Sequence, residues 1–559
     1  MNQKIQQLLK NEGENHLLPF FWQHGEDKAT LRKYMDVIYN SGVGAVCVES
    51  RPHPDFCGPK WWQDMDIILD DARSRGMKVW ILDDSHFPTG YATGALEDAP
   101  EELCRQHVLH QSFRIKGGRS AKLDIHKFIK HYREKQSLLG KLLSRSNKVR
   151  QYSDDVLLGV TALRVDAPGQ IDLAEKIKDG KLVWYAPAGD WIINLEKLSR
   201  NSGSHRSYIN MLDEASCRML IDAVYEPHYE HYKDDFGKTI AGFFSDEPEL
   251  GNGKLYPNGN VLGTDQPLPW SKELEEELRT RLGEAWRSKL CYLWENDLDA
   301  DETAHVRYVY MDAVTRLVEK NFSFQVGDWC RENGVEYIGH VIEDNNQHAR
   351  TGSSLGHFYR GMAGQDMSGI DDIGGQVYPQ GEKEPTKWMH FMPRDGEFYH
   401  YVLANLGVSL AAIDPLKKGR TMCEIFGNYG WQAGLRLEKY LSDHFLVRGV
   451  NYFVPHAFSP KAFPDPDCPP HFYAHGHNPQ YRAFGALMRY MNRVSELITD
   501  GKAVAPVAIL YHGEAEWTGE CMLMQKPAHV LADHQINYDF ILTDVFTEIE
   551  RYKTQFVDG

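Results

Sequence analysis

The feature of this sequence that most limits its fold is a repeated pair of segments, a short apolar run followed by a longer stretch with helical spacing. The run MKVWILD at 77–83 is of strand length, and Leu31, Met35 and Ile38 recur at helical spacing within 27–40. Strands of a parallel sheet are buried on both faces and therefore form continuous apolar runs. Eight runs have this character: 17–23, 44–49, 77–83, 239–245, 335–340, 369–373, 420–426 and 450–455. The pattern predicts an α/β fold, a (β/α)8 TIM barrel.

Two parts of the chain interrupt this alternation, 104–208 and a Gly/Pro-rich and then helical stretch at 250–300. Residues 104–208 contain β-rich pieces at 157–165, 181–185 and 190–195, so we expect a β-rich domain inserted after the third strand. A chain of 559 residues is also too long for one hydrophobic core. The expected division is a first part of the barrel at 1–103, the insertion at 104–208, the remainder of the barrel at 209–500 and a partial α/β domain at 501–559.

The final segment begins a second α/β pattern. The apolar run AVAPVAILY at 503–511 precedes a helix and another short strand, which indicates the start of a doubly wound domain. The remaining residues are too few to complete such a sheet, so we expect the chain to be truncated relative to its relatives. An incomplete sheet exposes an edge and an apolar face. We therefore expect 503–559 to be poorly packed alone or covered by a partner chain, and an oligomer could form through it.

The charge balance restricts the partners. The 79 acidic residues exceed the 62 basic ones, giving a net charge of −17, and such a surface repels nucleic acids. A carbohydrate substrate fits better. No apolar run reaches the roughly 18 residues of a membrane span, and residues 1–14 lack the apolar core of a secretory signal. The nine cysteines are scattered without a Cys-x-x-Cys pair, so we expect reduced thiols, no zinc site and a cytoplasmic location.

Carboxylates follow several of the predicted strands, where a barrel places its functional residues. Glu247 lies in FFSDEP at 243–248, and we expect Pro248 to hold the backbone extended and display Asp246 and Glu247 at the barrel mouth. Glu343 follows the fifth strand, and Glu424 lies within the apolar seventh strand. Any one of these could be a structural acid. Three on one rim indicate glycoside hydrolysis, which needs two carboxyl groups at the scissile bond.

Other residues near the strand ends are candidates for substrate binding. Multiple acids could hold sugar hydroxyls or a calcium ion, although no cofactor is required. Aromatic rings suit the apolar faces of sugars, whereas the histidine-rich loop at 471–477 lacks the spacing of a metal site on one helix face. The expected binding residues are Trp22, Glu49, Asp83, Asp84, Phe87, Asp246, His340, Asp371, Trp431 and His456.

At these positions the sequence resembles the α-L-rhamnosidase-like enzymes of glycoside hydrolase family 106. The resemblance rests on PFFW at 19–22, GMKVWILDD at 76–84 with FPTG at 87–90, GFFSDEP at 242–248, GH at 339–340 and RGVNYFVPHA at 448–457. It implies an inverting hydrolase with Glu247 as general acid and Glu343 as base. The sequence Glu343-Asp344-Asn345 departs from the family's usual Glu-Glu or Glu-Ser, which leaves the base ambiguous. After residue 500 the resemblance is to a flavodoxin-like domain.

Three alternatives remain open at this stage. The wider pattern of barrel glycosidases would pair Glu247 with Glu424 as a nucleophile and retain configuration, as in enzymes of the galactosidase type. A non-catalytic carbohydrate-binding barrel would keep the aromatic residues but lose one carboxylate, and all three glutamates are present here. A metal-dependent hydrolase would lose activity when a chelator removes its transition metal.

Overall fold

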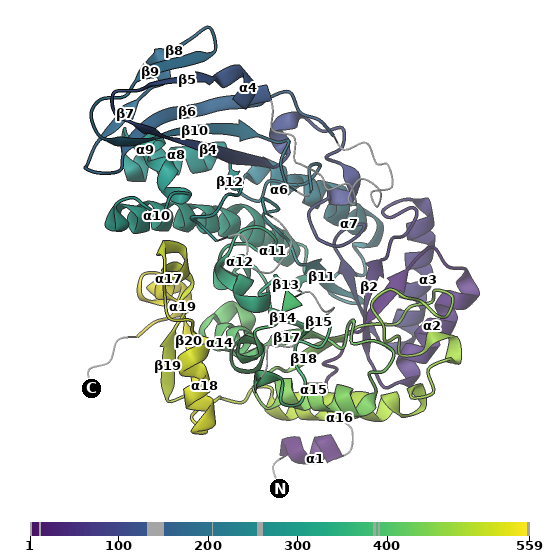
Figure 1. The fold of residues 1–559 in the computed structure, drawn as a ribbon. Helices are drawn as coiled ribbons and strands as arrows, with labels where there is room; N and C mark the ends of the chain where they lie inside the picture. The colour runs from purple at the N-terminus through teal and green to yellow at the C-terminus, as the bar shows by residue number, and fades with distance from the viewer. Residues whose placement is uncertain are drawn as a thin grey trace.

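Eight parallel strands form the centre of the molecule in the computed structural model (Figure 1). The structure describes residues 3–9, 13–130, 150–203, 205–253, 261–383, 387, 388 and 392–555. The strands are β1 (Phe20–Gln23), β2 (Ala45–Ser50), β3 (Lys78–Leu82), β11 (Ile240–Asp246), β13 (Glu336–His340), β14 (Ser368–Asp372), β17 (Thr421–Ile425) and β18 (Tyr452–Pro455). Each lies within two residues of a run expected from the sequence, apart from the later start of β1, so the eight predicted strands are confirmed.

The strands form two sheets, β1-β2-β3-β11-β13 and β14-β17-β18, with parallel pairing throughout. Isolated parallel bridges join Leu17 to Phe453 and Phe21 to Phe458, which brings β18 beside β1. At the other junction β14 lies beside β13. The two strands are so close there that a Cβ atom added to Gly369 would meet the Gly339 carbonyl oxygen. The mixed α/β fold with parallel sheets is confirmed.

Helices surround these sheets between successive strands. They are α2 (Lys28–Asn40), α3 (Pro59–Arg75), α6 (Glu214–Leu220), α7 (Glu226–Tyr232), α10 (Ala300–Val318), α11 (Gln325–Glu332), α12 (Phe358–Gly361), α14 (Ala404–Ile413), α15 (Leu435–Leu446) and α16 (Tyr481–Ile498). Local signals fix their ends. Asp27 accepts the backbone N–H groups of Ala29 and Thr30 at the start of α2, and Gly76, with φ +66°, ends α3.

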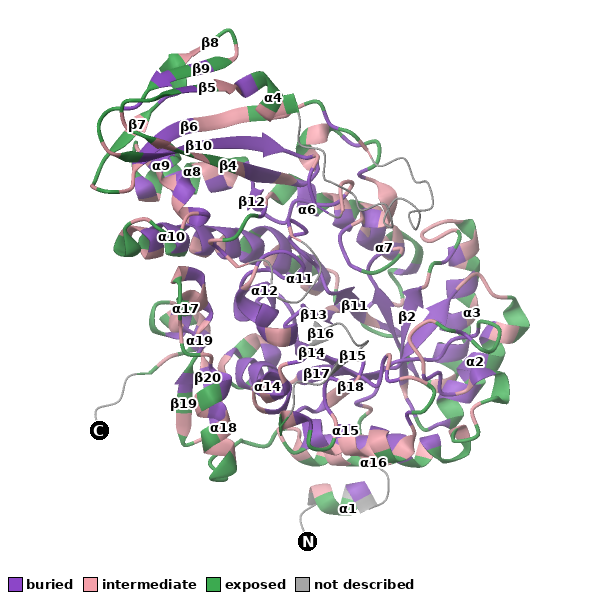
Figure 2. Cartoon of the chain, viewed as in Figure 1, coloured by how far each residue is buried: buried purple, intermediate pink, exposed green. Residues whose placement is uncertain are grey.

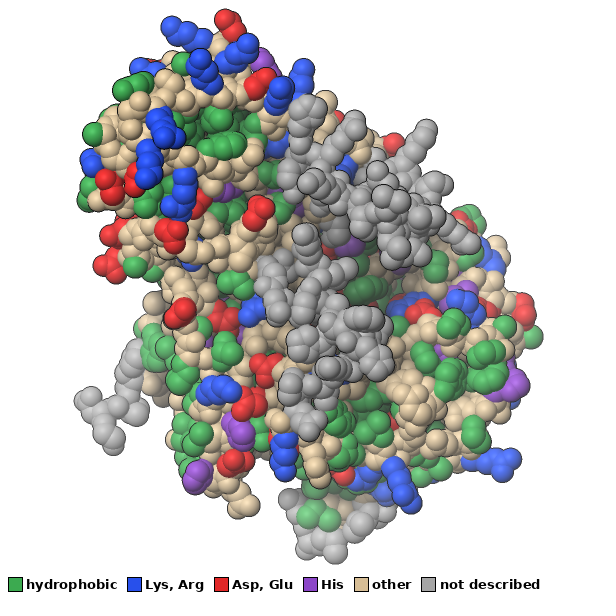
Figure 3. Space-filling view, in the orientation of Figure 1, with side chains coloured by type: hydrophobic (Ala, Val, Ile, Leu, Met, Phe, Trp, Pro, Cys, Tyr) green, Lys and Arg blue, Asp and Glu red, His purple; other side chains and the backbone are tan. Residues whose placement is uncertain are grey.

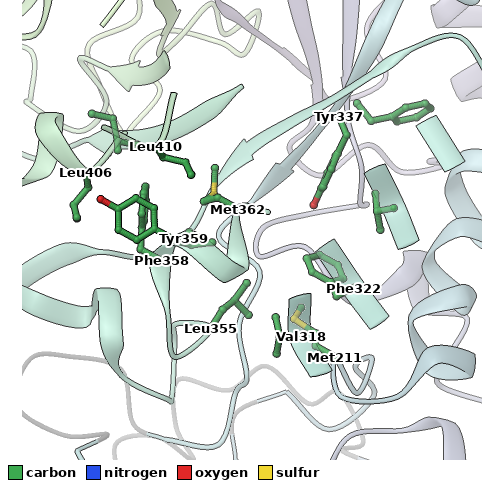
Figure 4. Close-up of a cluster of buried hydrophobic side chains, with 14 of the residues drawn as sticks. Met211, Val318, Phe322, Tyr337, Leu355, Phe358, Tyr359, Met362, Leu406 and Leu410 are labelled. Atoms are coloured by element: carbon green, nitrogen blue, oxygen red, sulfur yellow. The ribbon is translucent and has the colours of Figure 1, made fainter. Parts of the chain in front are cut away.

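Alternating strand side chains divide between two cores. Phe20, Trp22 and Phe244 belong to a small inner cluster enclosed by the strands, whereas Phe21 and Phe243 face the helices. The strands are consequently buried on both faces (Figure 2), which explains why each reads as a continuous apolar run. Figure 4 shows part of the helix-facing core, where Leu406 and Leu410 of α14 lie beside Tyr359 of α12.

The insertion between β3 and α6 is β-rich, as expected. Its strands are β4 (Gln106–Lys116), β5 (Ser120–Asp124), β6 (Val156–Arg164), β7 (Gln170–Asp172), β8 (Ile177–Lys178), β9 (Lys181–Tyr185) and β10 (Asp190–Ser199). They form two antiparallel sheets, and β12 (Leu268–Trp270) joins the larger one beside β4. Lys and Arg side chains gather on the outer surface of this part (Figure 3). The part of the insertion at 131–149 lies outside the described residues.

The C-terminal segment contains two parallel strands, β19 (Val507–Leu510) and β20 (Tyr538–Ile541), and the helices α17 (Gly513–Thr518) and α18 (Gln525–Asp533). Tyr511, Trp517 and Phe540 are buried, and the Tyr359 hydroxyl of α12 donates to the Phe540 carbonyl oxygen. The expectation of a poorly packed segment was therefore wrong for these three residues, because other parts of the same chain cover them. Among the described residues, no helix has the length and apolar character needed to cross a bilayer.

Candidate active site

A cavity of about 220 Å³ opens at the carboxyl ends of the eight strands. This end is where (β/α)8 proteins and open α/β sheets bind their ligands. Six of the expected site residues line the cavity, and so does Asp344, the direct neighbour of Glu343. The other lining residues come from the loops. The lining residues are Arg51, Phe87, Asp246, Glu247, Asp344, Asn345, Asp371, Ile373, Gly374, Gln376, Arg394, Tyr399, Glu424, Asn428, His456 and Cys468.

Glu247 lies one residue beyond β11 and has a backbone φ of +42°. The expectation that Pro248 holds this residue extended was therefore wrong. A non-glycine residue in this region costs about 1–3 kcal/mol, and such conformations cluster at functional sites. The conformation leaves the Glu247 side chain buried at the cavity wall. Burial, followed by the negative charge of Asp246, raises the pKa of Glu247 well above its usual range.

His340 lies at the centre of the carboxylates, at the end of β13. Its Nε2 atom lies 3.1 Å from Glu424 Oε2 and 3.4 Å from Asp246 Oδ1. Burial opposes the charged form of the ring, but these two carboxylates outweigh burial and raise the pKa of His340 well above its usual range. The two carboxylates therefore favour the charged form of His340.

Glu424 projects into the cavity from β17. It is buried, and burial raises its pKa, whereas the hydrogen bond from His340 opposes the rise. His456, which follows β18, places its Nε2 3.9 Å from Glu424 Oε1. Two histidines thus lie within 4 Å of this carboxylate.

Asp371 and Glu343 differ in what they face. Asp371, in β14, lines the cavity, and its Oδ1 is buried without a hydrogen-bond partner. Burial and the negative charge of Glu424 raise the pKa of Asp371 well above its usual range. Glu343 is buried behind the wall, where its Oε1 accepts the Asp371 backbone N–H at 2.9 Å. Burial raises the pKa of Glu343 to about 8, and the next residue, Asp344, lines the cavity in its place.

Several acids expected to bind substrate instead have partners within the protein. Asp83 accepts hydrogen bonds from Thr89, Tyr225 and Ser245. Asp84 accepts the backbone N–H groups of the loop after β3, including those of Gly90, Ala92 and Thr93. Glu49 is buried beneath Arg51, which donates to it at 2.6 Å. These three acids support the cavity wall without lining it.

The aromatic candidates also differ in whether they line the cavity. Phe87 lines the cavity and is 45% exposed, so its ring is available to a ligand. Trp22 is fully buried in the inner cluster, where the Arg51 guanidinium covers its ring at 4.3 Å. Trp431 contacts Phe463 and His471 outside the set of lining residues.

Sequence reasoning missed several residues of the wall. Arg51 lies two positions beyond Glu49 at the end of β2, and its position after a strand was a signal that could have identified it. Gln376, Arg394 and Tyr399 come from the long connection between β14 and α14, which no strand-end pattern marks. Arg394 adds positive charge to a wall that is otherwise mainly acidic.

Two groups of side chains in the described part of the chain could hold a metal ion. One contains Asp246, His340 and Glu424, and the other contains Glu247, His340 and Asp371, with ligand atoms within 4.8 Å of one another in each group. Both depend on the nitrogen of His340. Calcium takes oxygen ligands, so a transition metal would suit these two groups better than calcium.

Comparisons with solved structures identify proteins of similar fold. A rhamnosidase from Novosphingobium sp. PP1Y has 14% identity and a TM-score of 0.60, over 98% of this chain and 65% of that chain. A β-galactosidase from the Antarctic haloarchaeon Halorubrum lacusprofundi has 11% identity and a TM-score of 0.51, over 94% of this chain and 66% of that chain. A β-galactosidase from Bacillus circulans sp. alkalophilus has 11% identity and a TM-score of 0.53, over 95% and 65%.

The chain thus spans slightly less than two thirds of each of these three proteins. No protein-family model matches the sequence, and no curated protein is found to match it. At such low identity the structural similarity concerns the fold alone. The chain therefore has a glycosidase-like α/β fold.

Proposed function

We propose that this protein is a glycoside hydrolase in which the two sheets close as a (β/α)8 barrel. The observation that carries the proposal is that Glu247 and Glu424 line the same strand-end cavity and are both buried beside His340. Glu247 follows the fourth strand of the barrel order and Glu424 lies in the seventh. Two carboxyl groups that flank a sugar are the minimum that glycoside hydrolysis requires.

Glu247 is the general acid of the proposed reaction. Burial and the negative charge of Asp246 raise its pKa and favour the protonated carboxyl group, which can donate a proton to the leaving glycosidic oxygen. Glu424 is the nucleophile. Its carboxylate attacks the anomeric carbon as the bond to the leaving oxygen breaks, and the charge of His340 favours its ionised form.

The second half of the reaction releases the sugar. Glu247, now ionised, accepts a proton from water, and the water oxygen attacks the anomeric carbon and displaces Glu424. Both carboxyl groups then return to their starting states. Two displacements retain the configuration at the anomeric carbon. No step uses calcium.

This assignment differs from the pairing implied by the family 106 resemblance. Glu343 is turned toward the Asp371 backbone and does not line the cavity, which favours the galactosidase-type alternative with Glu424. If the chemistry is inverting instead, Asp344 or Asp371 is the better-placed base, because both line the cavity. Arg51, Phe87 and His456 are proposed to contact the sugar.

The sugar specificity of the protein is tested with a panel of aryl glycosides. α-L-Rhamnosides and β-D-galactosides are the first substrates, in view of the rhamnosidase and β-galactosidases with similar folds. Release of the aryl group by the purified protein, lost in Glu247→Gln, supports the proposal. A protein that cleaves no glycoside in the panel but binds sugars by calorimetry would instead be a carbohydrate-binding barrel.

A metal-dependent hydrolase is the second candidate, because two groups of potential ligands share His340. A bound transition metal would lower the pKa of a water molecule and supply a nucleophile. Activity that is lost on dialysis against a chelator and returns with zinc or manganese would favour this candidate.

A further inference from the structure

The loop after β13 supplies part of the cavity but has little regular structure of its own. It contains Asp344 and Asn345, both of which line the cavity, and continues as the 3-10 helix η7 (Asp344–Ala349). Asn345 and Asn346 have φ angles of +45° and +69°. Two successive residues in the left-handed region are unfavourable and persist only where their surroundings fix them.

The C-terminal segment supplies much of that fixation. The Tyr511 hydroxyl, just beyond β19, donates to the His348 carbonyl oxygen at 2.9 Å and lies 2.8 Å from His348 Nδ1. The Phe358 backbone N–H donates to the same hydroxyl at 3.3 Å. Tyr511 is 1% exposed, so these contacts lie within the protein interior. A single buried hydroxyl therefore joins both ends of the segment 348–358.

Trp517 of α17 makes a second attachment. Its indole Nε1 donates to the carbonyl oxygens of Ala349 and Gly356, at 2.9 and 3.0 Å. Glu516, from the same helix, lies 3.2 Å from His348 Nε2. The loop's own carbonyl groups are thus satisfied by a segment more than 150 residues later in the chain.

The third attachment reaches the part of the loop at the cavity. Gln525, at the start of α18, donates to Asp395 Oδ2 at 2.7 Å. The same oxygen accepts from Asn346 at 3.0 Å, and the Asp395 backbone N–H donates to Asn345 Oδ1 at 2.9 Å. The C-terminal segment therefore contacts, directly or through Asp395, the strained asparagines beside Asp344.

We propose that the C-terminal segment positions the active-site loop at 343–350, with Tyr511 as its principal positioning residue. The proposal rests on the proposed function insofar as it concerns catalysis. Tyr511 touches no substrate and acts through the loop that presents Asp344 and Asn345 to the cavity. Small displacements of groups around a reacting centre cost large factors in rate.

The test compares two variants that each remove one hydroxyl from this segment. Tyr511→Phe removes the hydroxyl that contacts the loop. Tyr538→Phe, the matched control, removes a hydroxyl of β20 that donates to the Tyr401 carbonyl oxygen, away from the loop. Trp517→Phe is a second test variant, in case Tyr511→Phe folds poorly. Hydrogen exchange of 343–350 and kcat per folded enzyme are measured in the full-length chain.

We expect faster exchange at 343–350 in Tyr511→Phe and Trp517→Phe, with a roughly tenfold or greater fall in kcat, as loss of a buried hydrogen bond predicts. Tyr538→Phe should change neither the exchange at 343–350 nor kcat. A role in stability alone would lower the melting temperature and leave kcat per folded enzyme unchanged. Unchanged exchange at 343–350, or faster exchange with unchanged kcat, would overturn the proposal. A wild-type protein without glycosidase activity counts against the proposed function, and exchange alone then decides whether the segment positions the loop.

Discussion

At the scale of single residues, the buried acids around His340 are distinguished by their neighbours. Glu247 and Glu424 both line the cavity, but a negative neighbour adds to burial at Glu247, whereas the His340 hydrogen bond opposes burial at Glu424. When the surroundings shift the pKa values of two carboxyl groups differently, one group is suited to be the acid and the other to be the nucleophile. Glu343 lies outside this pair, because it accepts a backbone N–H behind the wall.

Glu247→Gln should lower kcat at least about 100-fold, the usual contribution of a general acid. The melting temperature should barely change, since Gln resembles the protonated carboxyl group. The measurement is steady-state kinetics on a substrate with a poor leaving group. Glu343→Gln is the matched control and should stay within about tenfold of the wild type, because Gln can still accept the Asp371 N–H. If Glu343→Gln is as inactive as Glu247→Gln, the pairing that the family resemblance implies is restored, whereas a fully active Glu247→Gln would show that Glu247 is not the acid.

Glu424→Ala should be inactive but recover turnover in azide, forming a glycosyl azide that mass spectrometry identifies. Removal of the carboxylate leaves space for a small anion at the anomeric carbon. Asp371→Ala is the control, since Asp371 also lines the cavity from the neighbouring strand. Azide rescue of Asp371→Ala alone would transfer the nucleophile to Asp371.

The sequence could predict which strand ends carry acids, but not which neighbour of a pair reaches the cavity. Asp246, Glu247, Asp371 and Glu424 were all expected at the site and all line it. At 343–344 the expectation chose Glu343, yet the chain turns there so that Asp344 faces the cavity. That turn depends on contacts with the distant C-terminal segment, which no local pattern records.

At the scale of elements, helix α15 contains a buried acid with an unsatisfied oxygen. Glu438 Oε2 has no hydrogen-bond partner, and burial raises the pKa of Glu438 from 4.5 to about 8. The folded state therefore binds this proton more tightly than the unfolded state. The resulting stability is fully present below pH 4.5 and is lost as the pH rises to about 8.

Glu438→Gln should consequently be more stable than the wild type at pH 8 by about 3–5 kcal/mol, with a difference that shrinks toward pH 5. Urea unfolding across this pH range measures the effect. Glu332→Gln, an exposed position at the end of α11, should show no such pH-dependent difference. A gain in the free energy of unfolding that is the same at pH 5 and pH 8 would contradict its assignment to the raised pKa of Glu438.

The strands themselves were predictable because burial on both faces produces a signal within a few residues. The β12 strand of the insertion was not, because it comes from 268–270, outside the expected insertion at 104–208, and pairs with β4 over a long separation. Sequence patterns report what a segment buries more readily than which partner it pairs with.

At the scale of the whole molecule, the contact between the C-terminal segment and helix α12 includes a buried ion pair. Arg360 of α12 binds Asp544 through two hydrogen bonds of 3.0 Å, and both residues are 3% exposed. Arg360 also contacts Asp312 at 2.8 Å. A charged, bidentate contact of this kind is far more sensitive to loss of one partner than a surface pair.

Asp544→Asn should therefore destabilise the protein by about 3 kcal/mol, since it removes the carboxylate that binds the buried Arg360 through two hydrogen bonds. Because the segment shares its core with helices α12 and α14, we expect calorimetry to show a single transition displaced to lower temperature. Asp297→Asn breaks the exposed pair with Arg114, whose side chains are 71% and 59% exposed, and should change the melting temperature little. A separate early transition in Asp544→Asn, with the main transition unmoved, would instead show that the C-terminal segment unfolds independently of the rest of the protein.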